Sequence, residues 1–216
     1  MDGGRSKIFG IGLPKTGTTT LAKCLRVFGF STAPYSVDLL EQVLAADFSG
    51  LAEVSGRFDA FEDWPWPLVY VEMHQRFPDA RFILTLRSNA NAWLDSLRSH
   101  TRRNPARRSA ELRRKIFGQE DPWQFPQQYT RFYEQHTERV QSYFQRSGGK
   151  LLIACWESGD SWKELAEFLS LAAVPAVPFP HENASREALQ RQPAAWKRLR
   201  AWSDRWKRRG VKPNRK

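Results

Sequence analysis

The chain has 216 residues, which is enough for one domain with a sizeable core and too few for two full-sized domains. Its composition, 41% hydrophobic and 26% charged, excludes a disordered, collagenous or low-complexity chain. No apolar run approaches the roughly 18 to 20 residues of a membrane span, and the N-terminus lacks the apolar core of a signal peptide. We therefore expect a cytoplasmic protein in which Cys24 and Cys155, which lack metal-ligand spacing, are buried free thiols.

The net charge of +11 is concentrated in two segments. Residues 98–115 hold eight Lys and Arg against one acidic residue, and residues 184–216 hold twelve against two. Because the rest of the chain is mildly acidic, these blocks predict local surfaces for anionic substrates or lipid head groups rather than a nucleic-acid coat. A solvated helix face and a soluble tail are the simpler interpretation of the same charges.

Apolar runs and helical periodicities alternate along the chain. In chain order, the patterns predict a strand over 7–13, a helix over 18–28, a short helix over 36–46, a structured loop over 56–67, a helix over 68–77, a strand over 81–86, a helix from 89, a helix over 127–146, a strand over 151–155, a helix from 162, an irregular segment over 174–184 and a basic helix over 194–209. Strands separated by helices predict an α/β fold: a P-loop-like, three-layer α/β/α arrangement around a central, mostly parallel sheet. We expect this domain to span residues 1–184, followed by a basic, Trp-containing helical extension over 185–216.

The loop between the first predicted strand and helix is the strongest local signal. It reads Gly12-Leu-Pro-Lys15-Thr16-Gly17-Thr18-Thr19-Thr20. Backbone N–H groups that converge at a helix N-terminus, with hydroxyls and a lysine beside them, favour a phosphate-type anion. A polar glycine loop can also be a plain connection, but this collection of donors favours an anion site.

The spacing of this loop differs from that of a magnesium-dependent P-loop enzyme. In that motif a Lys and a Ser or Thr follow the last glycine, whereas Lys15 comes two residues before Gly17. The strand over 81–86 is followed by Arg87 rather than by a metal-binding aspartate, and an arginine supplies a second anion contact. These departures argue against a nucleotide kinase, which we keep as the first alternative function.

Several motifs together resemble a known family. The loop over 14–19 resembles the 5′-phosphosulfate loop of sulfotransferases that use 3′-phosphoadenosine 5′-phosphosulfate (PAPS). The segment Phe82-Ile-Leu-Thr-Leu-Arg87, with Trp93 and Ser96 after it, is similar to the family's 3′-phosphate strand and helix. Segments 61–66, 162–169 and 178–183 resemble a branch of small sulfotransferases found in bacteria and eukaryotes. The resemblance covers about residues 5–184 and implies PAPS as donor co-substrate.

The resemblance also implies which residues bind the donor. They are Pro14, Lys15, Thr16, Gly17, Thr18, Thr19, Thr20, Arg87, Ser96 and Trp156. The family serine usually lies eight residues after the arginine, where this chain has Asp95, so either Ser96 or Ser88 would hold the 3′-phosphate. Thr20 stands where cytosolic members carry an adenine-stacking Trp, and we expect Trp156 to pack on the adenine unless it belongs to the core.

In-line transfer of a sulfuryl group to an acceptor hydroxyl or amine, without a metal, is the chemistry that the resemblance implies. Lys15 would stabilise charge on the leaving phosphate, while a general base would deprotonate the acceptor. Cytosolic relatives use a histidine between the first two motifs, but residues 30–73 contain none, so we predict Asp63 as the base. A loop Asp beside Trp and Pro can also be a simple turn former. The other candidates are Asp59, Glu62, His74 and His100.

The sequence does not rank the possible acceptors. Trp64, Trp66 and Trp123 could line an apolar pocket for a phenol, a lipid or an aromatic product, or they could be core residues. The basic segments could instead steer an anionic carbohydrate, a phospholipid surface or an acidic peptide. A basic nucleic-acid or membrane-surface binder that uses its Arg- and Trp-rich tail, and a family member without activity, are further alternatives.

Overall fold

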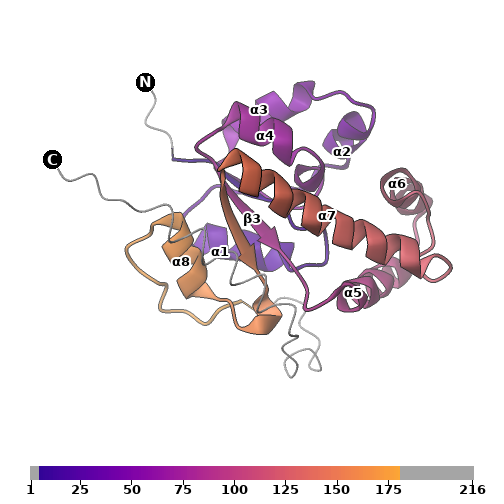
Figure 1. Ribbon diagram of the computed structural model, residues 1–216. Coiled ribbons are helices and arrows are strands. Elements are labelled where there is room, and N and C mark those ends of the chain that lie inside the picture. Colours follow the sequence, from indigo (N-terminus) through magenta and orange to yellow (C-terminus); the bar gives the residue numbers. More distant parts are fainter. Residues whose placement is uncertain (1–4, 181–216) are drawn as a thin grey trace.

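A computed structural model of the chain describes residues 5–180 and places four parallel strands in one sheet (Figure 1). The strands are β1 (Ile8–Gly10), β2 (Ala60–Phe61), β3 (Arg81–Thr85) and β4 (Lys150–Ala154), in the spatial order β2-β1-β3-β4. In the register of the sheet, Phe9 of β1 lies beside Phe61 on one side and Phe82 on the other. Parallel strands of this kind are buried on both faces, which explains their apolar sequences.

Helices cover both faces of the sheet. They are α1 (Thr18–Val27), α2 (Val37–Leu44), α3 (Ser49–Arg57), α4 (Tyr70–Arg76), α5 (Ala90–Arg103), α6 (Arg107–Phe117), α7 (Pro126–Ser147) and α8 (Trp162–Leu169), with short 3₁₀ turns over Trp66–Leu68 and Trp156–Ser158. In Figure 1, α7 runs along one side of the sheet, α1 and α8 lie on the other, and α5 and α6 lie at the right of the view.

The core follows the alternation of side chains along the strands. Phe9, Phe61 and Phe82 point to one face, where they join a large apolar cluster with residues of α2, α4, α5 and α7. Ile8 and Ile83, their neighbours in sequence, point to the other face and pack with α1 and α8. The predicted three-layer α/β/α fold is therefore confirmed.

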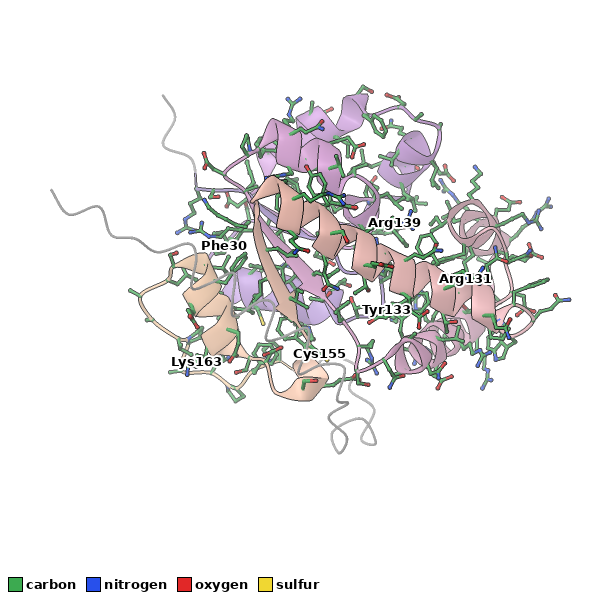
Figure 2. All side chains as sticks on the ribbon, in the orientation of Figure 1. Phe30, Arg131, Tyr133, Arg139, Cys155 and Lys163 are labelled. Atoms are coloured by element: carbon green, nitrogen blue, oxygen red, sulfur yellow. The ribbon has the colours of Figure 1, made fainter. Side chains whose placement is uncertain are left out.

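Helix α7 is the longest helix within residues 5–180. A stripe of aromatic side chains, which includes Tyr129, Tyr133 and Phe144, runs along it. Tyr133 and His136 lie on its buried side, whereas Arg131 and Arg139 are exposed on its outer side (Figure 2). The stripe is core, as its helical spacing predicts.

Three segments differ from the sequence-based expectations. The predicted loop over 56–67 contains strand β2, whose two residues are too few to give a periodic pattern. The hydrophobic periodicity of the sequence did not predict α3 or α6. Helix α6 was missed because it is so rich in Arg and Lys that its apolar side is short. The predicted helix over 194–209 lies outside the described residues. Within residues 5–180, no helix is both long and apolar enough to cross a membrane.

Candidate active site

A cavity of about 440 Å³ lies where the loops after β1 and β3 meet α5 and α6. Ligands of open α/β sheets bind at this edge, beyond the carboxyl ends of the strands. The lining residues are Pro14, Lys15, Gly17, Thr18, Thr19, Tyr35, Leu40, Asp63, Trp64, Arg87, Trp93, Ser96, Leu97, His100, Thr101, Asn104, Ser109, Leu112, Arg113, Ile116 and Phe117. The cavity thus brings together residues from four separate parts of the sequence.

The loop after β1 is folded as an anion-binding turn. Lys15 and Gly17 both have positive φ angles, 75° and 97°, and the turn between them leads directly into α1. No side chain caps the N-terminus of α1. Backbone N–H groups in such a turn, together with those of the first helical turn, make a concave site for a negative group. The backbone of Lys15 is held in a left-handed conformation that residues other than glycine rarely adopt, and such strain is typical of a functional loop.

Three ring N–H groups fix the loop by donating hydrogen bonds to its carbonyl oxygens. Trp93 Nε1 donates to Pro14 O at 2.9 Å, Trp156 Nε1 to Gly17 O at 3.1 Å and His136 Nε2 to Ile11 O at 2.8 Å. Burial lowers the pKa of His136 to about 4, so this imidazole is neutral and its Nε2 carries the proton. Because the carbonyl oxygens bond to these surrounding rings, the loop can present its N–H groups to the cavity.

The base of the loop is closed against the end of β3. Thr16 Oγ1 donates to Leu13 O at 2.6 Å and shares a hydrogen bond of 2.6 Å with Thr85 Oγ1. Gly12 lies so close to both threonines that a Cβ atom at this position would collide with them. Thr16 is therefore buried, and its hydroxyl stabilises the loop through these two hydrogen bonds.

Arg87 also lines the cavity and is held by Glu157. The guanidinium pairs with Glu157 Oε1 at 2.6 Å, and Glu157 Oε2 accepts the N–H of Ser88 at 2.8 Å. The backbone N–H of Arg87 donates to the Tyr133 hydroxyl at 3.0 Å. Arg87 lines the cavity, and its Nε is buried and makes no hydrogen bond to the residues around it.

Helix α5 carries the serine of the predicted 3′-phosphate pair. Its first turn is capped by Asn89, whose side chain accepts the N–H of Ala92 at 2.9 Å. Ser96 lines the cavity, whereas the neighbouring Asp95 is exposed on the other side of the helix. Ser88 is not among the lining residues. Of the two serines, Ser96 is thus the one that faces the same space as Arg87.

Two adjacent carboxyl groups, Glu62 and Asp63, lie beside Thr18 and compete for charge. Burial, and then the neighbouring Asp63, raise the pKa of Glu62 to about 8. Burial raises the pKa of Asp63 as well, but the N–H of Trp64 and the ammonium of Lys15 act in the opposite direction. Since Lys15 acts on Asp63, we assign the negative charge of the pair to Asp63, which lines the cavity, and the proton to Glu62.

Comparison with known proteins identifies the family of this chain. A family profile described as "Sulfotransferase domain" matches residues 7–188. The chain belongs to the sulfotransferase-domain family. A search of curated protein sequences gives no significant match. Among solved structures, the chain is similar in fold to a sulfotransferase from Alicyclobacillus acidocaldarius, with a TM-score of 0.56, 16% identity, and coverage of 94% of this chain and 93% of that one.

Within the sulfotransferase domain, three predicted donor residues do not line the cavity. The hydroxyl of Thr16 is engaged in the loop, Thr20 is buried in α1, and Trp156 packs across Gly17, where its indole ring excludes a Cβ atom. The remaining seven predicted donor residues and the predicted base Asp63 do line it. Thr16 and Trp156 thus contact the loop itself.

The other candidate residues are spread over the domain. Asp59 Oδ2 accepts bonds from the N–H and hydroxyl of Ser31, which is a structural role. His74 pairs with the Tyr143 hydroxyl at 3.0 Å, away from the cavity. His100, however, lines the cavity, and burial together with the charge of Lys15 lowers its pKa. Of the three tryptophans, Trp64 lines the cavity, Trp66 is core and Trp123 is exposed beside Arg102.

Several contacts that build the cavity were not predicted from the sequence. The bond of Trp93 to the loop, the pairing of Glu157 with Arg87 and the wall that α6 adds to the cavity all join residues far apart in sequence. One signal for Glu157 was present in the sequence, namely its position just after the predicted strand over 151–155, which is β4 in the structure. Within residues 5–180, no group of three or more His, Cys, Asp or Glu side chains is placed to hold a metal ion.

Proposed function

We propose that this sulfotransferase-domain protein transfers a sulfuryl group from PAPS to the hydroxyl group of a small acceptor. The observation that carries the proposal is the meeting of three groups in one cavity: the N–H-lined loop with Lys15, the arginine Arg87 with its free Nε, and the carboxylate Asp63. The first two suit a donor with an anionic group at each end, and the third suits an acceptor that must lose a proton.

The residues fit a nucleotide with a 5′-phosphosulfate and a 3′-phosphate. The loop over 14–19 would hold the phosphosulfate through its backbone N–H groups and the hydroxyls of Thr18 and Thr19. Arg87 and Ser96 would hold the 3′-phosphate, with Glu157 fixing the guanidinium in place. The donor supplies the sulfuryl group, and the protein supplies position and charge.

The reaction follows from where Lys15 and Asp63 lie. As the acceptor oxygen bonds to sulfur, the bond from sulfur to the bridging phosphate oxygen breaks, and its electron pair stays on that phosphate oxygen. The Lys15 ammonium, which lines the same cavity, stabilises the charge that develops there. Asp63 accepts the proton that the acceptor hydroxyl loses. Glu62 retains its own proton and so leaves Asp63 as the charged member of the pair.

The experiment that tests the proposal is calorimetric binding of 3′-phosphoadenosine 5′-phosphate (PAP), ADP and ATP, each with and without magnesium. Moderate salt screens the basic segment over 185–216, whose contact with an anionic surface is a separate proposal. We expect PAP to bind more tightly than ADP, independently of magnesium. Preference for ATP with magnesium would favour a kinase, and equal binding of all three would favour a surface binder; either result would overturn the proposal.

A further inference from the structure

The cavity has a second end that the donor-binding residues do not account for. Ser96 and His100 of α5 and Asn104, which caps the C-terminus of this helix, line it at intervals of four residues. At 1.5 Å per residue, Ser96 and Asn104 lie about 12 Å apart along the helix. We assign the part of the cavity around Arg87 and Ser96 to the donor and the part near Asn104 to the acceptor; the inference that follows rests on the proposed function.

Apolar side chains form one part of the wall at this acceptor end, and His100, Thr101, Asn104, Ser109 and Arg113 also line it. Of the apolar residues, Leu40 comes from α2, Trp64 comes from the loop after β2, and Leu112, Ile116 and Phe117 come from α6. Leu40, Trp64 and Phe117 are at most 9% exposed, so they form a firm surface rather than a mobile fringe. A sugar would bury several hydroxyl groups against these side chains without partners, and each would cost free energy. An apolar ring or chain would instead gain free energy by leaving water.

One polar atom at this end has no partner. Thr101, on the same helix as His100, is 7% exposed and lines the cavity, and its Oγ1 makes no hydrogen bond. Among the residues that the structure describes, the other buried side-chain atoms without a hydrogen bond are Arg87 Nε and Glu157 Oε1. Both belong to the donor end, where Glu157 Oε1 is in an ion pair with the Arg87 guanidinium. A buried hydroxyl without a partner is costly, and a ligand that supplies the partner removes that cost.

We propose that the acceptor is a compact, mainly apolar alcohol or phenol that carries a second polar group, and that this group hydrogen-bonds to the Thr101 hydroxyl. Its reacting hydroxyl lies toward Lys15 and Asp63, and its apolar body lies between Trp64 and α6. The cavity volume of about 440 Å³, which donor and acceptor share, limits the acceptor to a small molecule. Thr101 is then a specificity-determining residue.

The test uses two naphthols and one sugar as acceptors, with PAPS as donor. We expect sulfation of 2,6-dihydroxynaphthalene with a kcat/KM about tenfold above that of 2-naphthol, after correction for its two equivalent hydroxyls, and no sulfation of glucosamine. Thr101→Val should abolish this preference by lowering the kcat/KM for 2,6-dihydroxynaphthalene about tenfold, to the value for 2-naphthol. The control Ser99→Ala, on the exposed side of the same helix, should retain it.

A second pair of variants tests the apolar wall by binding rather than turnover. Ile116→Glu should weaken calorimetric binding of 2-naphthol to the PAP complex by tenfold or more, because it buries a charge in the cavity wall. Lys115→Glu, on the exposed side of α6, should not. In both variants the affinity for PAP should be unchanged, which shows that the fold and the donor end are intact.

The outcomes separate this inference from the function on which it rests. If PAP binds but glucosamine is sulfated and the naphthols neither bind nor react, the acceptor inference is overturned and the proposed function stands. If Thr101→Val keeps the preference for the dihydroxy compound, the assignment of Thr101 is wrong. If the wild-type protein binds no PAP, the proposed function fails and the acceptor inference with it.

Discussion

The two ends of the cavity are built in different ways. At the donor end, buried rings bond to the loop carbonyls, and the ion pair of Arg87 with Glu157 is about 14% exposed on either side. At the acceptor end, α6 is tied to α2 through Arg108, which pairs with Asp38 at 3.2 Å and Glu41 at 2.9 Å on the surface. Exposed ion pairs contribute little to stability, whereas buried bonds to a loop restrict it strongly. The loop at the donor end is thus held by buried bonds, whereas the ion pairs that link α6 to α2 at the acceptor end are exposed.

The largest effect should come from the proton acceptor at the junction of the two ends. Asp63→Asn should lower kcat by about 10² to 10⁴ while PAP affinity stays near the wild-type value. In the wild type, kcat should fall as the pH drops through the raised pKa of Asp63, and this acid limb should lie above the pKa of an ordinary aspartate. On the alkaline side, kcat should fall as Lys15, whose pKa burial lowers, loses its charge. Stopped-time assays from pH 4 to 10 check both limbs, with Asp95→Asn as control.

The second-largest effect should come from removing the charge of Lys15 at the donor end. Lys15→Ala should lower kcat by about 10² to 10³ and weaken PAP binding much less, because the charge that Lys15 stabilises develops in the transition state. Lys163→Ala, an exposed lysine on α8, serves as the matched control. An equal loss in kcat and in PAP affinity would assign Lys15 to ground-state binding instead.

Arg87→Ala separates the two phosphate sites of the donor end. It should weaken PAP by about 2 kcal/mol, or roughly thirtyfold, and leave adenosine 5′-phosphate nearly unaffected. Calorimetry with both nucleotides gives the comparison, and Arg98→Ala provides a control from α5. Equal losses for the two ligands would remove Arg87 from the 3′-phosphate site.

Rigidity of the donor loop can be reduced one bond at a time. Trp93→Phe removes the N–H that bonds to Pro14 O and should weaken PAP binding about tenfold, since a buried carbonyl loses its partner. Trp123→Phe, at an exposed position, should change nothing. Thermal unfolding of both variants shows whether the fold is retained, and unchanged PAP affinity in folded Trp93→Phe would contradict the role of the bond.

The smallest effect is expected at the acceptor end. Arg108→Ala should raise the acceptor KM about twofold to fivefold and leave PAP affinity unchanged, because it removes only the surface contacts between α6 and α2. Arg107→Ala, which breaks an ion pair within α6, is the control. If the Arg108 variant weakened PAP binding as much as acceptor binding, the two ends would not be separate.

The sequence predicted the donor end much better than the acceptor end, for physical reasons. The loop around Lys15 and the strand before Arg87 are short, contiguous segments whose residue types reflect local backbone requirements. The partners that hold them, such as Trp93 for the loop and Glu157 for Arg87, act across long sequence separations that no local pattern encodes.

The acceptor end depends on tertiary packing throughout. The three apolar residues of α6 that line the cavity stand among five Arg and Lys residues, so the basic pattern of 98–115 indicated a surface rather than a cavity wall. His100 illustrates the same limit: it opens the basic run in sequence, yet it lines the cavity in the fold. Strand β2 was missed because two residues have no periodicity.

The sparse burial of α6 has a consequence for how this protein can diversify. Phe117 is the one residue of the helix that is buried in the core, whereas Leu112 and Ile116 are only partly covered. Substitutions at such positions usually cost little folding stability. Evolution can therefore exchange residues of this cavity wall without disturbing the loop after β1, and relatives of this protein can differ in the small molecules that they accept.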